Sequence, residues 1–251
     1  MEELFYQMIF KRKSFHIFRG EKGLTEEKLA EIKKVFCGLR PLIEDIEVGI
    51  KIMPREETSC KRGEYCVLLF SEQKEGHLQN IGYLGEQLDL WLASQNIGVC
   101  WYGMGKVKEE DSKLGDLDFV IMLAIEQAGE GDFRKDMFKS KRKPLKEIWE
   151  GEPLSDVSAI VRFAPSACNT QPWIVERDGK ELKVFRYKKP GKRGMMPMDK
   201  VVYYNRIDIG IFLLFLDVCL THENMKYERT LYHDSGDDCA EKTLAAVYSV
   251  G

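Results

Sequence analysis

The sequence lacks the features that mark several protein classes. Its longest apolar stretch, Ile209 to Leu216, lies between Asp208 and Asp217 and is far too short to span a bilayer. The first ten residues include two glutamates and lead into a basic cluster, so they do not resemble the apolar region of a secretory signal. We therefore expect a cytoplasmic protein that does not enter a membrane.

Cysteine usage argues against a disulfide framework and against a zinc site. The seven cysteines are scattered, odd in number and contain no Cys-x-x-Cys pair, a pattern typical of reduced thiols. The charges are also balanced, with 38 basic and 41 acidic residues and a net charge of −3. Neither a metal nor a nucleic acid is an expected partner.

What the chain does contain is an alternation of helical and strand-like segments. Its 251 residues are 44% hydrophobic, enough for a large core, and the alternation predicts an α+β or α/β sandwich. Helices are expected from Thr25, as N-cap, to Gly38; from Leu78 to Asn96, with Gly98 ending the helix; from Ser155, as N-cap, to Phe163; and from Ile207 to Glu223. Strands are expected at 66–70, 119–125, 173–177, 181–186, 227–232 and 245–250, with a type I′ turn at Asp178-Gly179. The Lys-, Gly- and Met-rich residues 187–206 are expected to form a loop.

Two segments of the chain resemble each other at a constant spacing of 128 residues. The identical pairs include Ile81 and Ile209, Gly82 and Gly210, Leu88 and Leu216, Asp89 and Asp217, Leu92 and Leu220, and Asn96 and Asn224. About one identity would be expected by chance in such a window. The pattern predicts two degenerate copies of one unit, residues 1–130 and 131–251, although two independent amphipathic helices would also produce part of it.

The residues 164–173 form the most distinctive segment, with the sequence Ala-Pro-Ser-Ala-Cys-Asn-Thr-Gln-Pro-Trp. Its two prolines stiffen the backbone and bias the preceding residues away from a helix. Ser166, Asn169 and Gln171 then present polar side chains on a preset loop, an arrangement that favours ligand binding. The alternative is a helix end followed directly by a strand.

This segment resembles the Ala-Pro-Ser-x-x-Asn-x-Gln-Pro-Trp signature of the FMN-dependent nitroreductase family. The resemblance implies a nitroreductase-like fold in which the loop lies against the flavin of the neighbouring subunit. Pro165, Ser166, Ala167, Asn169 and Gln171 are then expected to bind the cofactor. The family carries this loop near its N-terminus, whereas here it lies in the second copy. Duplication explains the displacement, and the resemblance is to members built as a single-chain pseudo-dimer.

Two basic clusters resemble the family's phosphate-binding segments. Residues 11–18 contain Arg12, Lys13 and Ser14, which match an Arg-x-Ser arm, and residues 140–148 contain Lys141 and Arg142, which match a later Arg-x-Pro-Leu segment. Arginine suits a phosphate because its guanidinium presents a planar fork of donors. On composition alone, the first cluster could be a solvated basic arm. Arg142 could equally be the second copy's version of Arg12, and either interpretation leaves it as a candidate for binding the phosphate.

A third stretch, residues 96–105, resembles the family's Gly-x-x-Cys-Trp-x-Gly turn. The resemblance implies that Trp101, Tyr102 and Gly103 lie at the flavin and that a backbone N–H near Gly103 donates to flavin N5. One position departs from the family: His16 stands where a Lys or Arg near flavin O2 is usual. A neutral imidazole stabilises the anionic reduced ring less than a cation does.

The sequence therefore predicts an FMN-dependent oxidoreductase that passes a hydride from NADH or NADPH, through flavin N5, to a small electron-poor acceptor such as a nitroaromatic or quinone. The flavin performs the chemistry, so no catalytic side chain is expected. A non-catalytic flavin store or sensor, or a structural relic, is the alternative. Because the family dimer would be mimicked within one chain, a monomer with one FMN is expected.

Overall fold

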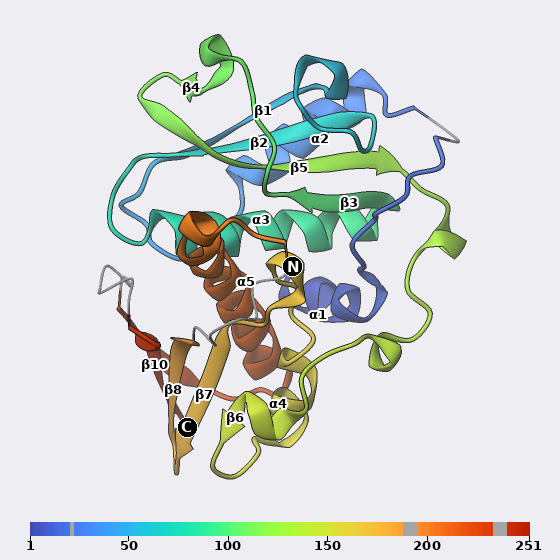
Figure 1. Ribbon diagram of the computed structural model, residues 1–251. Helices are drawn as coiled ribbons and strands as arrows, with labels where there is room; N and C mark the ends of the chain where they lie inside the picture. Colours follow the sequence, from blue (N-terminus) through green and yellow to red (C-terminus); the bar gives the residue numbers. More distant parts are fainter. Residues whose placement is uncertain (21–22, 188–194, 233–239) are drawn as a thin grey trace.

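A computed structural model describes residues 1–20, 23–187, 195–232 and 240–251. The chain forms two mainly antiparallel sheets, each packed on a long helix, and the two helices cross at the centre of the molecule (Figure 1). The helices are α1 (Glu2–Lys11), α2 (Glu26–Cys37), α3 (His77–Ser94), α4 (Ser155–Val161) and α5 (Val201–His222). This architecture confirms the predicted mixed α/β sandwich.

The first sheet is built entirely from the first half of the chain. Its strands are β1 (Val48–Pro54), β2 (Tyr65–Ser71), β3 (Ile97–Tyr102), β4 (Lys113–Leu114) and β5 (Leu117–Gln127). They are arranged in the order β1-β2-β5-β3, with β4 pairing to β5. Alternate residues of β2 point to opposite faces, so Val67 and Leu69 join the main core while Leu68 and Phe70 join a smaller cluster on the other face.

The second sheet is built from the second half of the chain. Its strands are β6 (Trp149–Glu150), β7 (Trp173–Asp178), β8 (Glu181–Tyr187), β9 (Tyr227–Leu231) and β10 (Lys242–Val250). Their order is β6-β7-β8-β10-β9, in which the short β6 is parallel to β7 and the other pairs are antiparallel. Apart from β4 and β6, the two sheets have the same order: β1, β2, β5 and β3 correspond to β7, β8, β10 and β9.

The central helices α3 and α5 occupy equivalent places between the second and third of these strands in chain order. Both are apolar around most of their circumference, and nearly all residues of α3 and those of α5 from Ile207 to Leu220 are buried. A helix that is apolar all round is stable only inside a core. Here each helix covers its own sheet on one side and meets the other helix on the opposite side.

Most of the predicted elements are present, and α2 begins as predicted. The Thr25 hydroxyl accepts a hydrogen bond from the backbone N–H of Lys28 at 3.3 Å, and Gly38 occupies the C-cap. The structure also contains α1, β1 and β3, which the sequence pattern did not predict. Several predicted boundaries differ from those in the structure.

The predicted end of α3 at Gly98 is wrong. The helix ends at Ser94, Asn96 adopts a left-handed conformation with φ of 57°, and Gly98 lies within β3. A side chain on Gly98 would come within 2.8 Å of the Phe15 ring, so this glycine admits the arm that follows α1 rather than ending a helix.

Three further boundaries differ from the prediction. Ser155 does not cap α4, because Leu154 occupies the N-cap position and Ser155 is the first helical residue. In the hairpin, Asp178 pairs with Glu181, so the turn residues are Gly179 and Lys180. Within the predicted loop 187–206, α5 already begins at Val201 after a 3-10 turn at Met198–Lys200, and residues 188–194 lie outside the described residues.

Candidate functional site

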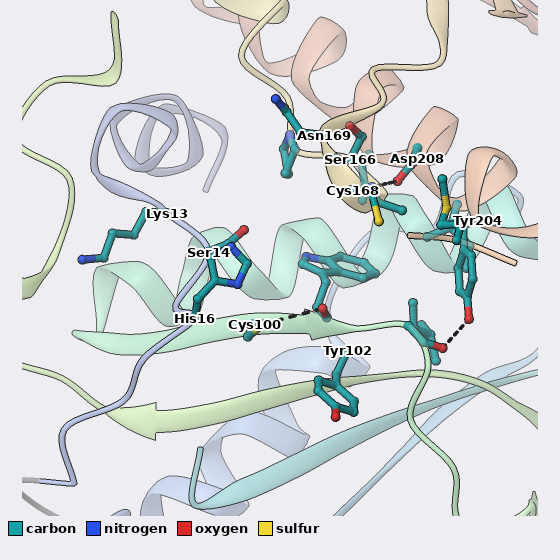
Figure 2. A pocket seen from close by; sticks show the side chains of 18 of the residues that line it. Lys13, Ser14, His16, Cys100, Tyr102, Ser166, Cys168, Asn169, Tyr204 and Asp208 are labelled. Atoms are coloured by element: carbon teal, nitrogen blue, oxygen red, sulfur yellow. Dashed lines mark hydrogen bonds between the residues drawn. The ribbon is translucent and has the colours of Figure 1, made fainter. Parts of the chain in front are cut away.

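A cavity of about 670 Å³ lies between the arm after α1, the end of β3, the 164–173 loop and the first turns of α5 (Figure 2). All but one of the residues predicted to bind a cofactor line it. They are Arg12, Lys13, Ser14, His16, Trp101, Tyr102, Gly103, Lys141, Arg142, Pro165, Ser166, Ala167 and Asn169. Segments far apart in the sequence therefore line one continuous cavity.

The arm reaches the cavity because it pairs with the edge of the first sheet. The backbone N–H of Phe15 donates to the carbonyl of Val99 at 2.9 Å, and Ser14 forms an isolated parallel bridge with Val99. Phe15 is buried and anchors the segment against β3, while Ser14 and His16 beside it face the cavity.

Arg12 is held in place by buried carboxylates. Its side chain is 3% exposed, and its Nε and Nη2 donate to Asp89 Oδ2 at 2.9 and 2.7 Å. Trp101 Nε1 donates to the same oxygen at 3.1 Å, and Glu86 Oε1 lies 3.6 Å from Arg12 Nε. Burial raises the pKa of Glu86 well above its usual range. Asp89 thus positions both the Arg12 guanidinium and the Trp101 indole where they line the cavity.

Hydrogen bonds within the 164–173 loop and from the loop to α5 hold its backbone in place. The Ser166 hydroxyl accepts from the backbone N–H of Gln171 at 2.9 Å, and the backbone N–H of Ala167 donates to Asp208 Oδ1 at 2.9 Å. Cys168, Asn169 and Gln171 all have positive φ, between 49° and 55°. Such backbone conformations cost free energy, and here the hydrogen bonds around them maintain the loop.

Gln171, predicted as a cofactor ligand, does not line the cavity. Its side chain is 3% exposed, and its Oε1 accepts from the backbone N–H of Lys143 at 2.7 Å. The Lys143 ammonium donates to the Gln171 carbonyl at 2.8 Å. Gln171 therefore joins the loop to residues 141–143, behind the cavity wall.

Arg142 also organises the loop. Its Nη1 donates to Asn169 Oδ1 and to the carbonyl of Lys141, both at 2.9 Å, and its Nη2 donates to the carbonyl of Phe163 at 3.1 Å. Its Nε is buried and has no partner among the described residues. Burial, followed by the nearby Arg12 and Arg134, lowers the pKa of Arg142 to about 10.

The structure adds Arg134, which sequence reasoning did not single out. Its backbone N–H donates to the carbonyl of Lys11, and its side chain lines the cavity without a hydrogen-bond or ion-pair partner in the described part of the chain. Burial and the charge of Arg12 lower the pKa of Arg134 to about 10. Three guanidinium groups thus share one end of the site with two carboxylates, which favours an anion there.

The end of β3 and the start of α5 form the opposite wall. The Tyr204 hydroxyl donates to the carbonyl of Gly103 at 2.5 Å, and a side chain on Gly103 would come within 2.8 Å of the Tyr204 ring. One turn further along α5, Asp208 is 3% exposed and its Oδ2 has no partner among the described residues. Burial raises the pKa of Asp208 well above its usual range. Asp208 lies on the predicted central helix and Tyr204 in the predicted loop 187–206, which the structure replaces with the first turn of α5. Only the fold reveals that both residues lie at the cavity.

No helix within the described residues has the length and apolar character needed to cross a membrane. The same residues contain no group of three or more His, Cys, Asp or Glu side chains arranged to hold a metal ion. The site offers hydrogen-bond donors, the buried acid Asp208 and apolar walls, an arrangement suited to an organic anion.

Comparison with known proteins gives one family and several similar structures. The family model described as "Putative TM nitroreductase" matches residues 4–219. A structure from Thermotoga maritima, described as a "putative nitroreductase", has a TM-score of 0.62 and 17% identity and covers 98% of this chain and 93% of that chain. No curated protein matches.

Two shorter structures also resemble part of the fold. A nitroreductase family protein from Clostridium novyi has a TM-score of 0.41 and 15% identity, covering 51% of this chain and 86% of that chain. A protein from Parabacteroides distasonis described as a "Putative NADH dehydrogenase/NAD(P)H nitroreductase" has a TM-score of 0.46 and 11% identity, covering 59% of this chain and 98% of that chain.

Proposed function

The chain belongs to the nitroreductase family whose model spans residues 4–219, and we propose that it is an FMN-dependent oxidoreductase. In this proposal NADH or NADPH reduces the flavin, and a small electron-poor acceptor such as a nitroaromatic or quinone reoxidises it. The observation that carries the proposal is the single cavity into which the arm, the Trp101–Gly103 turn and the Ala-Pro-Ser loop all converge.

The residues present fit a flavin mononucleotide. The volume of the cavity lies within the range typical of cofactor sites, about 300–1,000 Å³. Its basic end contains Arg134, whose guanidinium has no partner among the described residues, and Lys141, both suited to a phosphate. Gly103 lets the Tyr204 ring pack directly against the backbone of this wall, since a side chain there would come within 2.8 Å of that ring.

Each wall has a separate task in this proposal. When bound, FMN supplies hydride chemistry that amino-acid side chains cannot perform. Arg134 and Lys141 would hold the phosphate, while Arg142 and Gln171 keep the loop in shape behind it. Ser14, Ser166 and Asn169 would orient the ring with side-chain hydrogen bonds, and the backbone near Gly103 would approach flavin N5.

We also propose that the two halves are degenerate copies and that the cavity is the one complete site of an intrachain pseudo-dimer. The equivalent strand orders of the two sheets and the equivalent places of α3 and α5 support this proposal. The six cysteines in the described part of the chain are all unpaired, which favours a reducing, cytoplasmic location.

The visible spectrum of the purified protein, reconstituted with FMN and then mixed with NADH or NADPH, tests the proposed activity. We expect a flavin band that bleaches anaerobically with the nicotinamide and returns on addition of a quinone. A flavin band that no nicotinamide bleaches would instead support a flavin store. A protein that cannot take up FMN would overturn the proposed function.

A further inference from the structure

Arg62, like Arg134, was not predicted from the sequence, and it lies at the end of the cavity formed by the arm. It belongs to the loop between the 3-10 turn at Arg55–Glu57 and β2, and its Nη1 lies 2.6 Å from His16 Nδ1. The same nitrogen lies 3.6 Å from the thiol sulfur of Cys100. Arg62, His16 and Cys100 all line the cavity.

The loop presents Arg62 in a fixed position. The following Gly63 has φ of 69°, and a side chain there would come within 2.7 Å of the Ile125 carbonyl, so the chain turns tightly against β5. The Arg55 guanidinium donates to the Gly63 carbonyl at 3.0 Å, and the N–H of Ser59 donates to the Lys106 carbonyl at 2.9 Å. The loop is therefore anchored on both sides of Arg62.

The contact with Arg62 determines the state of His16. A guanidinium has donors only, so His16 Nδ1 must be the acceptor and the imidazole must be neutral, with its proton on Nε2. Burial, followed by the charges of Arg62 and Arg12, lowers the pKa of His16. The acids near the arm are otherwise engaged: Glu126 accepts from the Gly20 N–H, and Asp132 pairs with Arg19.

Arg62 itself carries an uncompensated charge. It has no carboxylate partner among the described residues, and the neighbouring Cys100 thiol is neutral because burial raises its pKa. The other cation of the arm that lines the cavity, Lys13, has its ammonium 4.6 Å from the centre of the Phe15 ring. Arg62 therefore adds a positive charge beside His16, and His16 contributes a donor and holds the guanidinium in position.

We infer that Arg62, positioned by His16, stabilises negative charge on the bound ligand and so favours the reduced, anionic flavin over the oxidised, neutral one. This inference rests on the proposed function. In related proteins a Lys or Arg is usual at the position of His16. Here the equivalent charge comes from Arg62, which lies 46 positions later in the chain. The redox potential then depends on Arg62 and not on protonation of His16.

Spectroelectrochemical titration of the FMN-loaded protein tests the inference, together with calorimetry of oxidised FMN binding. We expect Arg62→Ala to weaken the binding of reduced FMN about tenfold more than the binding of oxidised FMN. That ratio lowers a two-electron midpoint potential by about 30 mV. Arg62→Lys should keep most of the parent potential, and His16→Lys should restore it in the Arg62→Ala background.

Lys61→Ala is the matched control, because Lys61 is exposed on the same loop and does not line the cavity. It removes the same charge and should leave the potential unchanged. An unchanged potential in Arg62→Ala, or an equal shift in Lys61→Ala, would overturn the inference while leaving the proposed function intact. A parent protein that binds no FMN would overturn both.

NMR titration of the apoprotein supplies an independent readout. The pKa of His16 should rise toward its ordinary value in Arg62→Ala and remain low in Lys61→Ala. If the pKa of His16 is the same in the parent and in Arg62→Ala, the contact on which the inference rests does not exist.

Discussion

Gly82 on α3 and Gly210 on α5 are 128 residues apart, and each faces the backbone of the other helix at an equivalent point. A side chain on Gly82 would strike the carbonyl of Ile207, and one on Gly210 would strike the carbonyl of Gln79. Gln79 and Ile207 are also 128 residues apart. The crossing of the two helices is therefore two-fold symmetric within a single chain, as the interface of a homodimer would be.

Gly82→Ala should destabilise the protein by about 1–3 kcal/mol, because the added methyl group must push the two helices apart in a packed core. The measurement is the free energy of unfolding in urea. Gly131→Ala is the control, since Gly131 has no neighbour within 4 Å of the added carbon. A loss in Gly82→Ala no larger than in this control would show that the helices do not cross as described.

Arg134→Ala and Arg142→Ala should both weaken FMN binding, but for different reasons. Losing a charge-assisted contact to phosphate costs about 1.5–3 kcal/mol, or roughly ten- to a hundredfold in affinity. Arg134 has no other partner among the described residues, whereas Arg142 also holds the loop through Asn169 and Phe163. Calorimetry with FMN and with riboflavin, which lacks the phosphate, separates the two roles.

We expect Arg134→Ala to lose affinity for FMN alone and Arg142→Ala to lose affinity for both ligands. Equal binding of FMN by Arg134→Ala and the parent would place the phosphate elsewhere. Arg12→Ala is a poorer probe, because it leaves the buried Asp89 and Glu86 without their cation and should destabilise the fold by about 3–5 kcal/mol.

Asp208→Asn should change how stability depends on pH. Asp208 has a raised pKa in the folded protein and an ordinary pKa of about 3.9 when unfolded. As the pH rises above about 4, the unfolded chain loses this proton first, so the parent loses stability relative to the variant. The equivalent residue of the first half is Asn80, whose Oδ1 accepts from the N–H groups of Leu42 and Ile43.

An asparagine therefore suits this place in the fold and can keep the bond to Ala167. The free energy of unfolding of both proteins, measured in urea from pH 4 to pH 8, gives the difference attributable to Asp208. Other buried acids such as Glu86 cancel in the comparison. A difference that stays constant over this range would mean that Asp208 titrates normally in the folded protein.

One FMN per chain is the expected stoichiometry. At the place equivalent to Trp101, the second half has Arg229, which pairs with Asp217, the counterpart of Asp89. The hydroxyls of Tyr83 and Tyr248 donate to the same carboxylate at 2.8 Å. A symmetric pseudo-dimer would contain a second FMN site at this place. Here the side chains around Asp217 fill the space that such a second site would need.

Analytical ultracentrifugation with flavin quantitation provides the measurement, and we expect a monomer with one equivalent of FMN. A second equivalent per chain, or flavin bound only by a dimer, would contradict the pseudo-dimer. Arg229→Trp is an informative companion variant, since it restores the aromatic residue of the first half but leaves the tyrosines in place.

The features that could be predicted from the sequence are those that depend on residues close together in the chain. The Thr25 cap, the buried run in β2 and the polar loop at 164–173 could be read from neighbouring residues alone. Gly98 was wrongly predicted to end α3, because a glycine shortly after a helix usually marks its end. In the structure Gly98 has another role, since the Phe15 ring packs where a side chain at position 98 would lie.

The missed site residues share the same cause. Arg62, Arg134 and Asp208 belong to no recognisable motif, and each reaches the cavity only because the sheets and central helices assemble around it. Gln171 shows the opposite case: its place in a binding motif suggested a ligand contact, but its side chain does not line the cavity. Its amide is instead used by Lys143, which lies next to Arg142 in a separate basic cluster.

The walls of the cavity come from residues 12–16, 100–103, 165–169 and 204–208, which together span most of the length of the chain. A ribosome therefore completes the first sheet and α3 well before the opposite wall exists. The arm can pair with β3 early, but Arg12 and His16 face no partner wall until the first turns of α5 have emerged. On the proposed function, cofactor capture would be a late event in synthesis, because both the cavity and the burial of α3 are incomplete until α5 has emerged.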